Sequence, residues 1–250
     1  MLIAVLGACA SPPADPAARA AFEQTNDPFE PTNRVIFDVN MFADKWAVEP
    51  LAEGYRDGVP ELFQIWIRNF LGWLREPTVF ANDLLQADMS RAGRTSARFA
   101  INTLLGPFGL RDMAKQAGYE HQTADFGQTL HVWGFPEGPY LVLPLLGPSN
   151  VRDAIGLGAD TFMDPFRYMA VVNRSGAATW GRFGAEGIDE RAQNIDALDD
   201  LKRNSVDFYA ELRSIMRQRR AAQLREASSA AAPDSGDLYS DPALIGQPRK

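Results

Sequence analysis

Cysteine, histidine and lysine are all scarce in this chain. Its 250 residues include one cysteine, Cys9, and two histidines, His121 and His131. A single cysteine cannot form a disulfide within the chain, and two histidines are too few for a histidine-rich metal centre. Lysine occurs 4 times against 21 arginines, and the formal net charge is −7. This acidic balance argues against nucleic acid as a partner, because a phosphate backbone binds a basic surface.

Long apolar runs and common catalytic motifs are also missing. A spanning helix needs about 20 consecutive, mainly apolar residues, but the densest apolar segment, 62–74, is interrupted by Arg68 and Asn69. At about 1.5 Å per residue the segment covers only about 20 Å, which suits one membrane leaflet or a protein core. No Gly-x-Ser-x-Gly elbow and no Gly-x-x-x-x-Gly-Lys-[Ser/Thr] loop occur, which argues against a standard lipase and an ATPase.

The N-terminal residues carry a lipid-attachment signal. Leu6-Gly7-Ala8-Cys9 matches the bacterial lipobox, which is cleaved before a cysteine that is then acylated. Each buried CH₂ group contributes about 0.8 kcal/mol, so several acyl chains on Cys9 would anchor a domain firmly. The alternative is a small buried cysteine, but the Ala-, Ser- and Pro-rich stretch 10–16 is typical of a tether. Residues 1–8 carry no charge, so we expect a signal peptide truncated at its start.

The rest of the chain predicts one all-α domain. After a tether over 9–25, the domain is expected over 26–226 and a disordered tail over 227–250. Helical apolar spacing predicts helices near 33–48, 60–75, 77–85, 90–105, 149–162, 176–194 and 196–226, with Pro77 ending the second. A Gly- and Pro-rich region intervenes, and its apolar loop 138–148 has room for a short edge strand at Val142 and Leu143.

Polar residues occur singly within the apolar helices. They are Asp38, Asn40, Arg68, Asn69, Asn82, Asp83, Arg98 and Asn102. Since an unpartnered buried charge costs several kcal/mol, these side chains must face either water or one another. The pattern alone favours an ordinary amphipathic bundle with a solvated polar stripe over a wet interior.

Several segments resemble the MlaA (VacJ) family of Gram-negative outer-membrane lipoproteins. Together with the lipobox they cover about residues 9–215, and their number and order make the resemblance specific. The segments are 26–34, 76–86, 98–106, 125–130, 133–144, 147–153 and 186–192. Ala10, directly after Cys9, is also similar to the residue that permits release to the outer membrane.

The resemblance implies a helical ring embedded in the inner leaflet of the outer membrane, beside a trimeric porin. Such a ring removes mislocalised glycerophospholipids from the outer leaflet through an amphipathic channel and passes them to a soluble periplasmic carrier. This keeps the membrane asymmetric and requires neither catalysis nor a cofactor. On this interpretation the interior is wet, and the expected channel-lining residues are Asp38, Asn40, Arg68, Asn69, Asn82, Arg98 and Asn102.

Other interpretations remain at this point. One is a scaffolding lipoprotein that only anchors a complex. Another is a lipid hydrolase or acyltransferase using His121 and Asp125, although Phe126 stands where the acyltransferase motif has glycine. We expect Asp125 instead to cap the helix that carries Gln128.

An arginine-rich segment near the end of the last helix has two interpretations. Arg217, Arg219 and Arg220 are candidates for docking the acidic face of a carrier or for holding anionic head groups. A solvated helix end is the commoner explanation of such a cluster.

Replacing the lipobox cysteine tests the anchor. Cys9→Ala, expressed with a complete signal peptide, should remain unacylated and lose most of its sedimentation with outer membranes, because acyl chains supply most of the anchoring free energy. Quantitative blotting of membrane fractions measures this. Some retention through short apolar helices is compatible with the anchor, whereas complete retention would show that lipidation is not the main attachment.

Overall fold

The computed structural model describes residue 15 and residues 25–231. The expected lipidation site Cys9, the signal peptide, most of the tether and residues 232–250 lie outside the described residues. The early helices are α2 (Glu30–Ala43), the π-helix η1 (Asp44–Val48), α3 (Glu49–Gly58), α4 (Glu61–Leu85), α5 (Met89–Leu104), α6 (Met113–Gln116) and α7 (Phe126–Val132). After strands β1 (Tyr140–Leu143) and β2 (Gly147–Asn150) come α8 (Val151–Met163), α9 (Pro165–Val172), α10 (Gly176–Gln193), α11 (Ile195–Asn204) and α12 (Phe208–Ala231).

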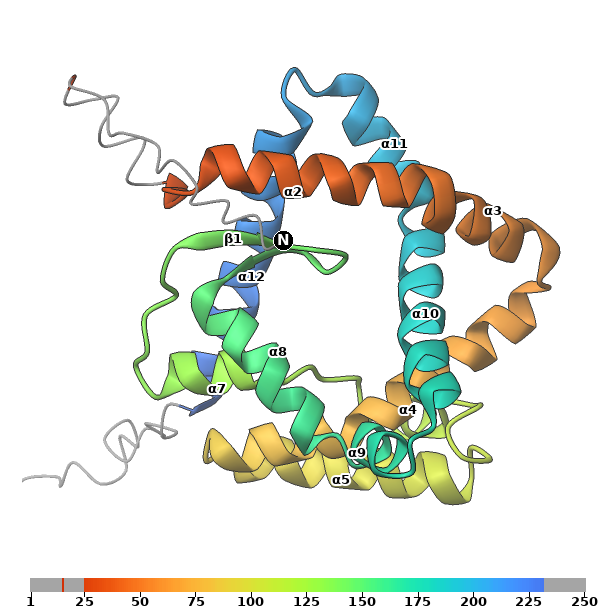
Figure 1. The fold of residues 1–250 in the computed structure, drawn as a ribbon. Coiled ribbons are helices and arrows are strands. Elements are labelled where there is room, and N and C mark those ends of the chain that lie inside the picture. The colour runs from red at the N-terminus through yellow and green to blue at the C-terminus, as the bar shows by residue number, and fades with distance from the viewer. Residues whose placement is uncertain (1–14, 16–24, 232–250) are drawn as a thin grey trace, which may run out of the picture.

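The helices follow one another around a ring (Figure 1). Helix α2 forms its upper side, α10 its right side, and α4, α5 and α9 its lower side. Helix α8 and the β1–β2 hairpin complete the left side, with α12 behind them. The predicted all-α class and ring arrangement are therefore confirmed. Across residues 25–231, no helix combines the length and apolar content that a membrane span requires.

Helix α4 is longer than the sequence predicts. Pro77 was expected to end a helix, but it lies inside one continuous helix of 25 residues. An internal proline costs about 3 kcal/mol because it removes a backbone hydrogen bond. Buried residues on both sides of it, Leu74 before and Val79 after, compensate by holding the helix in the fold.

The expected last helix is divided in two. Ser205 ends α11 in an extended conformation, with ψ of 139°. Asp207 then accepts a hydrogen bond from the backbone N–H of Ala210 (3.1 Å), which caps the start of α12. At its far end α12 continues to Ala231, beyond the expected boundary, and Leu224 and Ala227 on it are buried.

The hairpin is fixed to α2 by two asparagines on one helix face. Its strands pair antiparallel, with Tyr140 opposite Asn150, which agrees with the predicted short edge strand. Asn33 donates to the carbonyl of Tyr140 (3.1 Å) and accepts from the N–H of Val142 (3.0 Å). About two helical turns further along α2, Asn40 bonds to the turn of the hairpin. These amides replace the backbone partner that an edge strand lacks.

Asn40 bridges the hairpin turn in the same two-sided way. Its Nδ2 donates to the carbonyl of Leu143 (2.9 Å), and its Oδ1 accepts from the N–H of Leu145 (2.8 Å). Leu145 has a positive φ of 62°, which strains a side-chain-bearing residue. Asn40 therefore stabilises a turn whose backbone conformation is unfavourable for Leu145.

Apolar packing in the interior is sparse. Three small buried clusters centre on Phe37, on Ala52 and on Trp73. The largest fully buried side chains are instead polar: Gln128, Asn33, Asn82, Thr95, Thr129, Asp27 and Asp83. Hydrogen bonds and ion pairs, rather than a large apolar core, therefore join these helices.

Removing one buried hydroxyl tests this. Thr95, on α5, donates to Asp83 Oδ2 on α4 (2.6 Å), and neither side chain is exposed. Thr95→Val keeps the shape but leaves the carboxylate short of a donor, so the free energy of unfolding should fall by about 1–3 kcal/mol. Denaturant unfolding of the detergent-solubilised protein measures this. The neighbouring Ser96→Ala, on the exposed face of α5, should change stability by no more than about 0.5 kcal/mol; equal effects would contradict the assignment.

Candidate functional site: a polar interior within an apolar exterior

Large apolar side chains cover much of the outer surface. Leu104 and Phe162 are 80% and 79% exposed. Others with more than half of their surface exposed include Val35, Val39, Phe42, Trp46, Leu51, Leu62, Met89, Ile155, Met169, Val171, Val172 and Trp180. Monomers in water rarely expose a large contiguous apolar patch unless it meets a partner or a membrane.

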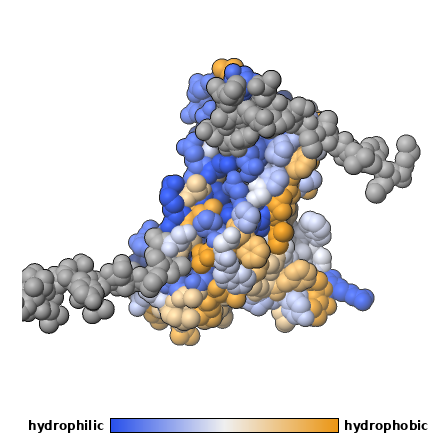
Figure 2. All heavy atoms as spheres, turned by 90° about the vertical axis from the view of Figure 1, so that its left-hand side faces the viewer, coloured by the Kyte–Doolittle hydropathy of each residue, from blue (hydrophilic) through white to orange (hydrophobic). Residues whose placement is uncertain are grey.

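These side chains are unevenly distributed. Figure 2 shows hydrophobic residues gathered over the lower part of the molecule and hydrophilic residues toward its upper part. The lower part is built from α4, α5 and α9, and the upper part from α2 and α11 (Figure 1). On the face shown in Figure 2 the lower end therefore has the polarity of a lipid-facing surface, while α2 and η1 at the upper end also expose Val35, Val39, Phe42 and Trp46.

A buried ion-pair cluster joins α4, α5 and α6. Arg98 on α5 pairs with Glu76 on α4 (3.1 Å) and with Asp112 at the start of α6 (3.1 Å), and also donates to the carbonyl of Tyr119. Asn102, one turn after Arg98, donates to the same Asp112 (3.1 Å). Two expected channel residues are thus brought together, but both are buried and their hydrogen bonds are made within the protein.

Asn82 occupies a second buried cluster, between α4, α7 and α8. Its Nδ2 donates to Asp160 on α8 (2.8 Å), and its Oδ1 accepts from the hydroxyl of Thr129 on α7 (2.8 Å). Burial raises the pKa of the Asp160 carboxyl to about 6, although hydrogen bonds from the Phe126 N–H and from Asn82 oppose the shift. Asn82 therefore acts as a junction between helices.

A row of arginines and carboxylates lies where α10 meets α4 and α9. Arg68 and Arg75 on α4 reach Asp189 and Glu186 on α10, each at 3.3 Å. The carboxylates are buried, at 7% and 9% exposure, while the arginines are 43% and 54% exposed. Buried acids thus hold half-exposed guanidinium groups in place.

The row continues beyond this pair. Glu186 also receives Arg167 of α9 (2.8 Å) and Arg182 (2.9 Å), and Arg182 extends the row to Asp164 (2.7 Å). Burial opposes ionisation of Glu186, but the surrounding arginines lower its pKa below the ordinary value. We call Arg68, Arg75, Arg167 and Arg182, with their carboxylates, the α4–α10 arginine row.

The remaining predicted channel residues have different surroundings. Asp38 is exposed on α2, Asn69 donates to the carbonyl of Leu110 (3.1 Å), and Asn40 is the buried clamp of the hairpin turn. Of the seven expected residues, Arg68 alone combines a charged, half-exposed side chain with membership of the arginine row.

The three candidate docking arginines of α12 also differ in their surroundings. Arg220 lies inside the fold, where it binds both Asp125 (2.7 Å) and Asp153 (2.8 Å). Arg217 bonds to the carbonyl of Thr25 (2.7 Å) and pairs with Glu137 (3.0 Å). Arg219 is exposed. The charge of Arg220 is therefore neutralised within the protein rather than offered to a partner.

The two residues of the hydrolase alternative have separate partners. His121 lies 3.6 Å from Glu76, whereas Asp125 is held by Arg220 and accepts from the N–H of Gln128 (2.8 Å). Asp125 therefore caps α7, as the sequence predicts. Within residues 25–231, no cluster of three or more metal-ligating side chains is found.

The sequence did not identify the acidic partners. Glu186 and Asp189 stand three residues apart on α10, which places both on one helix face. Arg75 precedes Glu76 on α4 and was likewise not selected. Segment 186–192 had been selected for its family resemblance, and the acidic pair inside it was the signal that could have identified these partners.

A mainly helical ring whose buried junctions are polar and whose surface exposes many large apolar side chains indicates a membrane-associated class of protein. A family model for the MlaA lipoprotein matches residues 25–223. The chain belongs to the MlaA lipoprotein family.

Relatives and a solved structure support this membership. The chain is 35% identical to the intermembrane phospholipid transport system lipoprotein MlaA of Escherichia coli K12, covering 86% of this chain and 82% of the relative. It is 30% identical to the Haemophilus influenzae protein of the same name, covering 76% of each chain, and 30% identical to an uncharacterised Rickettsia bellii protein. A solved structure presented as the structural basis for maintenance of bacterial outer membrane lipid asymmetry matches with a TM-score of 0.68 and 34% identity, over 82% of this chain and 98% of that one.

The shifted carboxyl of Asp160 predicts a pH-dependent stability. Its pKa is higher in the folded chain, about 6, than the ordinary 3.8. Between these values the folded chain retains a proton at Asp160 that the unfolded chain has released, so the contribution of Asp160 to stability should fall by on the order of 3 kcal/mol as the pH rises from about 4 to about 6. Asp160→Asn should reduce this slope in thermal unfolding, while Asp38→Asn, an exposed control, should keep it. Equal slopes in all three proteins would contradict the prediction.

Proposed function

We propose that this protein removes mislocalised glycerophospholipids from the outer leaflet of the outer membrane and passes them to a soluble periplasmic carrier. Support comes first from its family, since named relatives are lipoproteins of an intermembrane phospholipid transport system. It comes also from the distribution of polarity, which suits a protein whose outside meets lipid. This distribution, with polar side chains buried and large apolar side chains exposed, is the structural observation that carries the proposal.

The proposed setting is the inner leaflet of the outer membrane. Acyl chains on Cys9 would tether the chain, and the apolar lower part of the ring would lie among lipid tails (Figure 2). A ring that enters one leaflet needs no spanning helix, and none is found within residues 25–231. A trimeric porin beside the ring and a soluble carrier in the periplasm complete the proposed arrangement.

The α4–α10 arginine row is the best candidate for the polar path. A phospholipid head group carries a phosphodiester, and guanidinium groups bind phosphate oxygens in a fork geometry. Arg68 and Arg75 are exposed enough for the phosphate of one lipid to bind, leave and be followed by the next. Their buried carboxylates keep binding moderate, because each arginine already has a partner.

The chemistry of this path needs no covalent step. Head groups would move between arginines while acyl chains follow apolar surface, so the cargo leaves unchanged. We therefore propose a conduit and not an enzyme, with no cofactor. Lipid analysis distinguishes the three alternatives. A conduit changes the distribution of phospholipid between leaflets without new products, an enzyme produces lyso-lipid or free fatty acid, and a scaffold does neither.

Arg75 offers the cleanest test of the path, because Glu186 keeps Arg167 and Arg182 when Arg75 is lost. Arg75→Leu should fold and reach the membrane, yet slow phospholipid removal by about tenfold, which corresponds to about 1.4 kcal/mol in the barrier. The assay is outer-leaflet phospholipid in a strain lacking its own copy, read by detergent sensitivity and by labelling with an external phospholipase.

Two variants and one chemical readout complete this experiment. Arg75→Lys should restore part of the rate, and Arg94→Leu, on the exposed face of α5, should behave as wild type. Lipid extracts should contain no additional lyso-lipid. Normal outer-leaflet clearance by a folded, correctly localised Arg75→Leu protein would exclude the arginine row from the path.

A further inference from the structure

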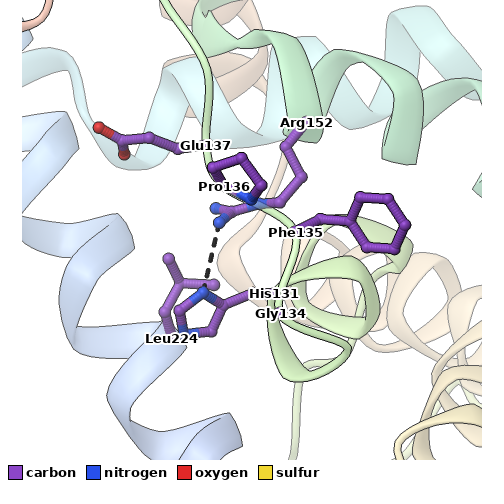
Figure 3. Close-up of a pocket in the computed structure, with 7 residues that line it drawn as sticks. All are labelled: His131, Gly134, Phe135, Pro136, Glu137, Arg152 and Leu224. Carbon is purple, nitrogen blue, oxygen red and sulfur yellow. Dashed lines mark hydrogen bonds between the residues drawn. The ribbon is translucent and has the colours of Figure 1, made fainter.

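A separate pocket of about 380 Å³ lies away from the arginine row. It is open to the surface and is bordered by the end of α7 and the segment after it, the first turn of α8 and the last part of α12 (Figure 3). Its lining residues are His131, Gly134, Phe135, Pro136, Glu137, Arg152 and Leu224. Ligand pockets commonly start near 300 Å³, so this volume suits a head group and part of a glycerol rather than whole acyl chains.

The base of the pocket contains a buried arginine with donor capacity to spare. The Arg152 side chain is 3% exposed, and its Nε donates to Asp153 (3.1 Å). Its guanidinium points toward His131, with Nη1 3.3 Å from Nδ1 of the imidazole (Figure 3). Nη2 is buried and makes no hydrogen bond to a described residue. An unsatisfied buried donor is unfavourable, so a ligand oxygen that bonds to it would be favourable.

The groups around the Arg152 guanidinium favour the binding of an anion there. Burial, together with the charges of Arg152 and Arg220, lowers the pKa of His131, which favours the neutral ring, whose Nδ1 can accept a hydrogen bond from Arg152. Asp153 is already neutralised by Arg220, at 2.8 Å. Arg152 also lies in the first turn of α8, a helix of 13 residues whose dipole favours a negative charge at this end.

Glu137 makes the same pocket amphoteric. Its Oε1 accepts hydrogen bonds from Asn26 and from Arg217, both at 3.0 Å. A carboxylate in the lining disfavours a purely anionic ligand and can receive a cation. Phe135, Pro136 and Leu224 add apolar surface to the lining. The combined chemistry fits a zwitterion with a phosphodiester, an ammonium group and a short apolar continuation.

We propose that this pocket binds the head group of an aminophospholipid, with the phosphodiester at Arg152 and the ammonium group at Glu137. The site rests on the proposed function for its lipid source and adds a head-group preference to it. Because Glu137 can accept a charge-assisted hydrogen bond from an ammonium group, phosphatidylethanolamine should bind more tightly than phosphatidylglycerol, which lacks that group.

Binding can be measured without transport. The full-length acylated protein in a non-ionic detergent is titrated with dihexanoyl phosphatidylethanolamine, dihexanoyl phosphatidylglycerol, glycerophosphoethanolamine or inorganic phosphate, using calorimetry and phosphorus NMR. The wild type should bind the phosphatidylethanolamine at least fivefold more tightly than the phosphatidylglycerol. Inorganic phosphate should bind at least tenfold more weakly than either lipid.

Three variants assign the contacts. Arg152→Gln should weaken both lipids at least tenfold, whereas Glu137→Gln, which keeps an acceptor for Asn26 and Arg217, should remove only the preference for phosphatidylethanolamine. Arg225→Gln, which removes an exposed charge from α12, should change neither affinity. Circular dichroism and thermal unfolding verify folding. If Arg152→Gln does not fold, the loss of preference in Glu137→Gln decides the result.

Each contrary outcome has a distinct meaning. Unchanged affinities in folded Arg152→Gln, or an unchanged preference in Glu137→Gln, would overturn the head-group site. Inorganic phosphate binding as tightly as the lipids would assign a free-anion site instead, and glycerophosphoethanolamine matching the lipid would show that the apolar lining contributes nothing. Failure of binding with normal clearance of outer-leaflet phospholipid would reject this site and leave the proposed transport intact.

Discussion

Ion pairs between arginines and buried or partly buried carboxylates are the interaction on which this fold depends. Arg98 joins α4, α5 and α6 through Glu76 and Asp112, and Arg220 joins α12 to α7 and α8 through Asp125 and Asp153. Removing one partner from a buried pair typically costs 3–5 kcal/mol, since the other charge is left uncompensated. Each arginine therefore determines which helices become neighbours, which the small apolar clusters could not do alone.

This mode of assembly agrees with an apolar surrounding. Between helices in lipid, apolar contact provides little net driving force, because lipid tails are as apolar as leucine. Polar contacts inside the ring retain their directionality, while the exposed apolar side chains remain available to lipid. On the proposed path, guanidinium groups that reach the surface, such as that of Arg75, would also bind phosphate. Structure and proposed activity thus use one residue type for two purposes.

The sequence predicted the class of fold well, together with several local features. Helical spacing, the short edge strand and the capping role of Asp125 all follow from neighbouring residues, and the structure agrees with them. Pro77 misled the prediction because contacts with other helices outweigh its local cost. Asn82 shows why the site was harder: its partner Asp160 lies 78 residues away, so a polar position was visible but its junction role was not.

The scarcity of large buried apolar side chains also affects how the protein responds to temperature. Unfolding raises the heat capacity through newly exposed apolar surface and lowers it through newly exposed polar surface, giving about 12–15 cal/mol/K per residue in ordinary domains. Here the largest fully enclosed side chains are amides, hydroxyls and carboxylates, and many apolar ones are already outside. The heat-capacity increment should consequently be small for a chain of this length, and the curve of stability against temperature correspondingly flat.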